Sequence, residues 1–283
     1  MSAYADSKSP APTSLGRPPV PARIMGILNV TPDSFSDGGR YTDLDAAVEA
    51  ARAMRADGAD IIDVGGESTR PGADSVSAGE ELERVIPVIR AIREEGCQAI
   101  SIDTSKPEVM AAAVAAGATM INDVMALRAE GAVEAARDLG VPVCLMHMQG
   151  LPRTMQKNPS YDDVVIEVRD FLLGRVEACA SAGLDARRLM IDPGFGFGKT
   201  LEHNLTLLAN LDVLVDTGIP VLVGLSRKSM IAKMLDRPVG NRAAASAALA
   251  LLAVQRGASM VRVHDVTETA DALNVAAWVA GRE

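Results

Sequence analysis

Cysteine, aromatic residues and positive charge are all scarce in this sequence of 283 residues. The three cysteines, Cys97, Cys144 and Cys179, form no CxxC pair, which excludes a disulfide framework and a cysteine-based zinc site. Aromatic residues make up only 3% and the net charge is -9, so neither a base-stacking platform nor a basic nucleic-acid footprint is expected. No apolar run approaches the roughly 18 residues that span a membrane. We therefore expect a cytoplasmic protein that binds neither nucleic acid nor membrane.

The short motifs of several enzyme classes are missing as well. No GxGxxG follows the first apolar run, HExxH is absent, and Pro193 breaks the Walker A spacing in the run DPGFGFGKT. We interpret the glycines of that run as allowing a tight backbone path that presents Phe195 and Phe197. These rings either form an apolar wall for an aromatic ligand or pack in the core. His147 is interpreted as a polar group in the wall of a barrel rather than as a metal ligand.

From residue 24 onward, short apolar runs alternate with alanine-rich segments of helical periodicity. The runs number eight and are spaced by about 34 residues on average, the length of one strand–helix unit. Runs that are apolar on both faces, each followed by a helix, are typical of a parallel sheet covered by helices. We expect a single α/β domain over residues 23–283, a (β/α)₈ TIM barrel, with an open doubly wound sheet as the alternative. Residues 1–22, with five prolines and no apolar segment, are expected to be a flexible tail.

Polar residues are expected where the runs end, and a barrel gathers such ends at one rim that carries the active site. These residues are Asn29, Asp63, Asp103, Asn122, His147, Asp192, Ser226 and His264. The loops over residues 26–41 and 65–81 are longer than a strand–helix turn requires, so we interpret them as closing over a substrate. Carboxylate and amide groups at Asp103, Asn122 and Asp192 match a flat heterocycle with several N–H donors.

Basic residues stand at the last two strand ends. Lys228 lies where the seventh run meets a helix and is either a Schiff-base lysine or a hydrogen-bonding cation. The helix N-terminus beside Ser229 suits an anion. Arg262 and His264 are two residues apart on the eighth run and so share one side. If that side is the interior, the pair suits a phosphate or diphosphate.

Eight segments, in order over residues 24–266, carry a resemblance to a known family. They are GILNVTPDSFSDGG, DIIDVGGESTRPGA, SIDTSKPEVM, INDV, CLMHMQGLPRTMQ, IDPGFGFGKTLEHN, GLSRKSMI and RVHDV. Together they resemble the dihydropteroate synthases of the bacterial folate pathway, whose fold is also a (β/α)₈ barrel. One departure is Met125-Ala126 after INDV, where the family pattern has glycine before the leucine.

The resemblance implies an activity, a cofactor and a set of site residues. The activity is condensation of 6-hydroxymethyl-7,8-dihydropterin diphosphate with 4-aminobenzoate to 7,8-dihydropteroate and pyrophosphate, through a pterin cation, and it is the target of sulfonamides. The residues implied to be catalytic are Lys228, Arg262 and His264. Those implied to hold the pterin are Asp103, Asn122, Asp192 and Lys228. Those implied to hold the diphosphate are Asn29, Arg262 and His264, with Mg²⁺ at Asn29. Those implied to line the aminobenzoate pocket are Phe35, Thr69, Arg70, Pro71, Phe197 and Ser229.

Three other functions fit parts of the same pattern. One is a pterin-binding methyltransferase that serves a corrinoid protein, and another is a Schiff-base aldolase that uses Lys228. The third is a catalytically silent homologue. Independently of the activity, the small-residue segment over residues 243–253 predicts a homodimer through close helix contact.

Overall fold

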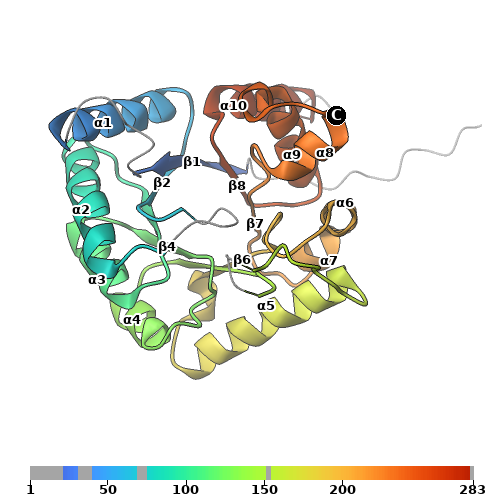
Figure 1. Ribbon diagram of the computed structural model, residues 1–283, viewed down its shortest axis with the longest axis horizontal. Helices are drawn as coiled ribbons and strands as arrows, with labels where there is room; N and C mark the ends of the chain where they lie inside the picture. Colours follow the sequence, from blue (N-terminus) through green and yellow to red (C-terminus); the bar gives the residue numbers. More distant parts are fainter. Residues whose placement is uncertain (1–21, 31–39, 69–74, 151–153, 281–283) are drawn as a thin grey trace, which may run out of the picture.

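The computed structural model describes residues 22–30, 40–68, 75–150 and 154–280 (Figure 1). The predicted tail lies outside these ranges apart from Ala22. Each of the eight predicted apolar runs contains one strand. The strands are β1 (Arg23–Asn29), β2 (Ile61–Gly65), β3 (Ile100–Asp103), β4 (Met120–Asp123), β5 (Val143–Met146), β6 (Leu189–Asp192), β7 (Leu222–Val223) and β8 (Met260–Val263).

All strand pairings in the sheet are parallel, and the strands close into a barrel. The order is β6-β5-β4-β3-β2-β1-β8-β7, so β1 pairs with β2 on one side and β8 on the other. A parallel bridge between Ile191 and Val221 then joins β6 to the segment that leads into β7. The predicted (β/α)₈ barrel is thereby confirmed, and the open sheet is excluded.

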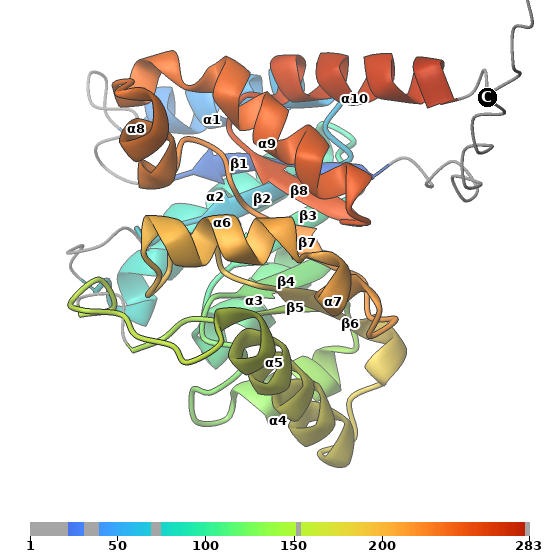
Figure 2. The same cartoon turned by 90° about the vertical axis from the view of Figure 1, so that its right-hand side faces the viewer.

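Helices surround the barrel on its outside (Figures 1 and 2). Those of the described residues are α1 (Arg40–Ala56), α2 (Ala78–Glu94), α3 (Pro107–Ala116), α4 (Ala132–Leu139), α5 (Val164–Ser181), α6 (Leu201–Ala209), α7 (Asp212–Val215), α8 (Ser229–Leu235), α9 (Ala243–Gln255) and α10 (Val266–Ala280), with short 3₁₀ turns at Ala186–Arg188 and Val239–Asn241. Local sequence explains several of their boundaries. Ser77 and Glu80 form a capping box at the start of α2, and Gly140 adopts a left-handed conformation that ends α4. Of the helices that the structure describes, none combines the length and hydropathy that a membrane span requires.

The barrel interior is layered from apolar to charged. At the amino ends of the strands, inward side chains form a closed apolar floor, made of Met25, Ile61, Met120, Cys144, Leu222 and Met260. Side chains alternate along a strand, so the inward position two residues further on lies one layer nearer the carboxyl end. On β2 that position is Asp63, and on β8 it is Arg262. The floor therefore separates the polar layers above it from solvent below.

The strands end near the expected residues, with the largest differences at β2, which ends two residues after Asp63, and at β7, which ends three residues before Ser226. Asn29, Asp103 and Asp192 are the last residues of β1, β3 and β6. Asp63 instead lies in the middle of β2, which continues to Gly65. The strand continues because its backbone stays paired with both β1 and β3 through Gly65. Asp63 is consequently buried inside the barrel rather than placed at its rim.

Candidate active site

Arg262 joins residues of three other strands into one network near the carboxyl end of the barrel. Its Nε donates to Asp63 Oδ2 at 2.6 Å, and its Nη2 donates to Asp103 Oδ2 at 2.7 Å. Asn122 Nδ2 donates to the same Asp63 oxygen at 3.2 Å. Asp63 is fully buried, and its Oδ1 has no hydrogen-bond partner within the part of the chain that the structure describes. Ion pairs and a hydrogen bond thus link strands β2, β3, β4 and β8 directly above the apolar floor.

Burial and charge compete in this network. Burial raises the pKa of Asp103 to about 7, although the positive charge of Arg262 opposes the shift. Burial also disfavours the charged form of Arg262, but the carboxylates of Asp63 and Asp103 outweigh it and raise the pKa of the guanidinium. Arg262 therefore stays charged at every physiological pH. Sequence reasoning missed its pairing with Asp63, for which the signal was a charged residue inside the apolar run IIDVG.

Asp192 and Lys228 form a second charged region, across the barrel mouth. Asp192 Oδ1 accepts from Gly194 N at 2.7 Å. Burial raises the pKa of Asp192 to about 6, against that hydrogen bond and the charge of Lys228. Burial lowers the pKa of Lys228 to about 8, with Asp192 opposing. Lys228 Nζ lies 4.1 Å from the centroid of the Phe197 ring, within range of a cation–π interaction. The mouth thus presents an acceptor, a cation and an aromatic face together.

The glycine-rich segment after β6 follows a path that only glycine permits. Gly194 has a φ of 66°, and a Cβ there would lie 1.9 Å from the carbonyl oxygen of His147. Gly198 has a φ of 64°, and its Cβ would lie 2.6 Å from the carbonyl oxygen of Gln149. The predicted tight path is confirmed, and the two rings take different roles. Phe195 packs in the hydrophobic core, whereas Phe197 packs beside the mouth in a cluster that includes Met146.

His264 lies just beyond β8 and contacts Ser226, which follows β7. The Ser226 hydroxyl oxygen accepts from the His264 backbone N–H at 3.1 Å and lies 3.1 Å from its Nδ1. A hydroxyl that accepts from one group can donate to the other, which leaves Nε2 as the ring nitrogen that carries the proton. Burial lowers the pKa of His264 to about 3, and the charge of Arg262 adds to the shift. The imidazole is therefore neutral at pH 7.

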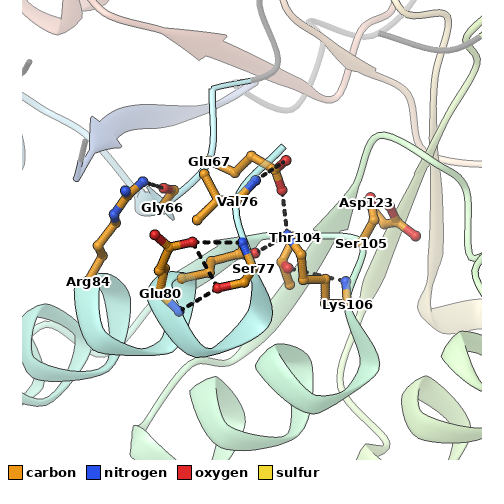
Figure 3. Close-up of polar contacts among 11 residues, drawn as sticks. Gly66, Glu67, Val76, Ser77, Glu80, Arg84, Thr104, Ser105, Lys106 and Asp123 are labelled. Carbon is orange, nitrogen blue, oxygen red and sulfur yellow. Dashed lines mark hydrogen bonds and ion pairs between the residues drawn. The ribbon is translucent and has the colours of Figure 1, made fainter. Parts of the chain in front are cut away.

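A cluster of ions connects the loops that follow β2 and β3 (Figure 3). Lys106 Nζ lies 2.5 Å from Glu67 Oε2 and 2.5 Å from Glu81 Oε2. Glu67 Oε1 in turn accepts from the backbone N–H of Val76 at 3.1 Å. Glu67 precedes residues 69–74 and Val76 follows them. Lys106 binds Glu67, which in turn binds Val76, so Lys106 holds both flanks of that segment near Glu81 of α2. Sequence reasoning missed this cluster, because its members come from three separate segments that no motif connects.

Replacing Lys106 by methionine is expected to lower the free energy of unfolding by about 3 kcal/mol, because Glu81 is left buried without its counter-ion. The double variant Lys106→Met/Glu81→Leu is expected to regain most of that loss, since the fully buried charge of Glu81 is then removed and the remaining carboxylate, Glu67, is partly exposed to solvent. Urea denaturation monitored by circular dichroism measures both. If the single variant is as stable as the unmodified protein, the ion pair does not contribute to stability.

The departure from the family pattern at Ala126 falls on a strained position. Ala126 and Leu127 both have a φ of 54°, in the left-handed region that favours glycine. Asp123 accepts from the backbone N–H of Leu127 at 2.7 Å, and Arg175 donates to the carbonyl oxygen of Ala126 at 2.9 Å. These bonds hold the loop in a conformation that alanine alone does not prefer. The two bonds therefore support this loop conformation with alanine at position 126.

Of the remaining predicted site residues, the structure describes two and leaves the others outside its described ranges. Asn29 ends β1 at the rim, and Ser229 is the exposed first residue of α8. Phe35, Thr69, Arg70 and Pro71 lie outside the described residues.

Side-chain oxygens of Asn29 and Asp103 lie beside Gly65 at the end of β2. A Cβ added to Gly65 would lie 3.7 Å from Asp103 Oδ2 and 3.9 Å from Asn29 Oδ1, so both oxygens border the place where Gly65 lacks a side chain. Among the described residues, no group of three or more His, Cys, Asp or Glu is arranged to hold a metal by itself. A site with few protein ligands, all of them hard oxygen donors, suits Mg²⁺, because this ion usually takes its other ligands from phosphate and water.

Comparison with known proteins agrees with this geometry. Residues 25–264 match the family described as "Pterin binding enzyme". The chain is 54% identical over 258 residues to the dihydropteroate synthase of Haemophilus influenzae, covering 91% of this chain and 93% of that protein.

Two solved structures extend the comparison. The dihydropteroate synthase of Xanthomonas albilineans with 4-aminobenzoic acid superimposes with a TM-score of 0.87 at 55% identity, over 93% of this chain and 94% of the other. That of Yersinia pestis with a sulfonamide drug complex superimposes with a TM-score of 0.88 at 48% identity, over 93% and 95%. These names favour a synthase over the methyltransferase and aldolase alternatives. The chain therefore belongs to the dihydropteroate synthases, within the family of pterin-binding enzymes.

Proposed function

We propose that the barrel mouth joins 6-hydroxymethyl-7,8-dihydropterin diphosphate to 4-aminobenzoate, releasing 7,8-dihydropteroate and pyrophosphate. The observation that carries this proposal is the grouping of a buried carboxylate, a cation and an aromatic ring at Asp192, Lys228 and Phe197. A pterin has a donor edge, a carbonyl and a flat face, which these three groups complement. An arylamine can then stack at the outer side of the same mouth.

The pterin is held by four side chains around the mouth. Asp192 has one oxygen bonded to Gly194 N, and its other oxygen accepts from the 2-amino and ring N–H edge. Lys228 donates to the ring carbonyl and N5. Asp103 and Asn122, already oriented by Arg262 and Asp63, complete the polar ring of the pocket. Because these groups are fixed before substrate arrives, little ordering cost falls on binding.

The diphosphate is held at the β1 and β8 side of the mouth. Arg262 uses Nε and Nη2 for Asp63 and Asp103, and a guanidinium has five N–H groups, so others remain for the diphosphate. His264 donates through Nε2 as a neutral imidazole. Asn29 would hold Mg²⁺ through its side-chain oxygen, and the ion would supply positive charge that stabilises the leaving pyrophosphate.

The reaction follows a dissociative path. The C–O bond to the diphosphate breaks, its electron pair leaves with pyrophosphate, and the methylene cation is delocalised into the dihydropterin ring. The amine nitrogen of 4-aminobenzoate then attacks the methylene carbon and loses a proton. An arylamine is already neutral at pH 7, so no strong general base is needed. The neutral His264 agrees with this, because it has little tendency to take up a proton.

4-Aminobenzoate lies against Phe197 and Ser229, at the outer side of the pterin pocket. Phe35, Thr69, Arg70 and Pro71 complete its binding site, as the family resemblance implies. Sulfonamides resemble 4-aminobenzoate in shape, and in charge when their N–H is ionised, and so are expected to compete for this site.

A pyrophosphate-release assay tests the function. Release is expected only when the pterin diphosphate and 4-aminobenzoate are both present, and a sulfonamide is expected to inhibit competitively with 4-aminobenzoate. Borohydride is expected to trap no substrate on Lys228, which distinguishes the synthase from an aldolase. A folded protein that releases no pyrophosphate with both substrates is a silent homologue.

We also propose a homodimer, through the outer faces of α9 and α10. In α9, Ala247, Ala250 and Val254 are buried, while Ala248 and Leu252 are exposed on another side. The neighbouring α10 exposes Val275, Trp278 and Val279, with fractional exposures of 65%, 71% and 62%. Apolar surface of this extent on adjacent helices is typical of an interface.

The dimer is expected to have twice the 29.6 kDa of one chain by light scattering at micromolar concentration. Since Trp278 is the only tryptophan, its fluorescence emission reports directly on burial of this face. Val275→Glu is expected to give a folded monomer with red-shifted emission. Ile166→Glu, on α5 at the opposite side of the barrel (Figure 1), is the control and leaves the dimer intact. A monomeric unmodified protein contradicts the proposal.

A further inference from the structure

The glycine-rich segment between β6 and α6 has a hydrogen-bond partner for most of its backbone polar groups. Gly196 N donates to Asn204 Oδ1 at 2.7 Å, and Gln156 donates to the carbonyl oxygen of Gly196. The hydroxyl of Tyr161 donates to the carbonyl oxygen of Gly198 at 2.8 Å. Helix α6 therefore holds this segment at one point, and the connection between β5 and α5 holds it at two.

Lys199 holds the segment at two further points and is itself buried. Its Nζ donates to the carbonyl oxygen of Gly194 at 2.9 Å and to that of Phe197 at 3.1 Å. The same Nζ lies 2.9 Å from His147 Nδ1. An ammonium has three N–H donors, and these three acceptors match them in number. Burial lowers the pKa of Lys199 to about 7, so its charged form depends on these three acceptors, and each lost bond leaves an ammonium unsolvated.

Both backbone groups of Phe197 depend on Lys199. The carbonyl oxygen of Phe197 accepts from Lys199 directly. The N–H of Phe197 donates to the carbonyl oxygen of Gly194 at 3.1 Å, and that oxygen is the second acceptor of Lys199. By contrast, Asp192 is placed by strand β6 and its backbone oxygen accepts from His147 N at 2.9 Å. Lys199 thus controls the position of Phe197 more directly than that of Asp192.

His147 completes the arrangement as a neutral acceptor. Burial lowers the pKa of His147 to about 2, and the charge of Lys199 contributes to the shift. Its ring also packs edge-on against Phe171, with ring centroids 4.9 Å apart. With Nδ1 facing the ammonium, the ring proton resides on Nε2. His147, which sequence reasoning assigned to the barrel wall, therefore accepts a hydrogen bond from Lys199 and helps to hold its ammonium group in place.

We propose that Lys199 is a positioning residue for the 4-aminobenzoate pocket, acting through the backbone of Phe197 and the face that its ring presents beside Lys228. This inference rests on the proposed function, in which Phe197 contacts 4-aminobenzoate. It assigns Lys199 no contact with either substrate. Loss of Lys199 therefore affects the two substrates unequally.

A double-variant cycle tests the proposal by steady-state kinetics. Lys199→Met is expected to raise KM for 4-aminobenzoate about tenfold or more, while KM for the pterin diphosphate changes less than about threefold. Phe197→Leu is expected to raise the same KM. The double variant is expected to be no worse than Phe197→Leu alone, because Lys199 acts through that side chain. Tyr161→Phe, which removes a bond to the same segment at Gly198, is the matched control and is expected to leave both KM values nearly unchanged.

The conservative variants separate positioning from folding. Lys199→Arg retains charge and donors and is expected to restore part of the 4-aminobenzoate affinity, whereas Lys199→Gln is expected to fall between Arg and Met. These two variants also replace Lys199→Met if circular dichroism shows it to be unfolded. Equal KM increases for both substrates, additive effects in the double variant, or an unchanged KM for 4-aminobenzoate overturn the inference. If Phe197→Leu itself leaves that KM unchanged, the proposed pocket is wrong and the inference falls with it.

Discussion

Replacing Arg262 by methionine is expected to lower the free energy of unfolding by about 3–5 kcal/mol, because Asp63 and Asp103 then remain buried without a counter-ion. The same change is expected to reduce kcat for pyrophosphate release by about 100-fold or more, since a donor to the leaving group is lost. Urea denaturation and the pyrophosphate assay measure the two effects separately.

A second variant distinguishes the structural effect from the catalytic one. Arg262→Met/Asp63→Asn removes one unpaired charge and is expected to recover a large part of the stability. It is expected to recover none of the activity, because the guanidinium that donates to the leaving group is still absent. Recovery of activity together with stability shows that Arg262 acts only on the fold.

Replacing Asp192 by asparagine is expected to weaken pterin diphosphate binding by about 1–3 kcal/mol, a loss of about 5- to 150-fold in affinity. The amide oxygen of asparagine can keep the bond from Gly194 N, which turns the NH₂ group toward the donor edge of the pterin. Two donors then face each other in a buried site. Isothermal titration calorimetry measures the affinity, and an unchanged value removes Asp192 from the pterin site.

The raised pKa of Asp192 predicts a pH dependence for the same binding step. The carboxyl accepts from the pterin only when ionised, and its pKa is about 6. The contribution of Asp192 to binding is therefore expected to be full well above that pKa and to weaken as the pH falls through 6, by about tenfold at pH 5. Asp103, with a pKa of about 7, adds to the weakening on the same side. In Asp192→Asn the dependence is expected to be shallower, and an equal slope in both proteins contradicts the assignment.

Local periodicity was sufficient to predict the architecture. Parallel barrel strands are apolar on both faces, so each run was visible without knowledge of its neighbours. The same local signal placed Asn29, Asp103 and Asp192 at strand ends, because a polar residue that follows such a run leaves the apolar layer. It misplaced Asp63, since its polarity resembles that of a strand end although β2 continues past it.

The positions of Asn29, Asp103 and Asp192 at strand ends therefore follow from the sequence alone, but the partners of the charged residues do not. Arg262 and Asp63 are 199 residues apart, and they meet only because β8 pairs with β1, which pairs with β2. Lys199 reaches His147 across 52 residues for a similar reason, through the pairing of β5 with β6. Side-chain alternation determines that a residue points inward, whereas closure and register of the barrel determine which charges face one another there. Since pKa values and buried ion pairs depend on those distances, only the tertiary structure decided which cations position the site and which remain to bind substrate.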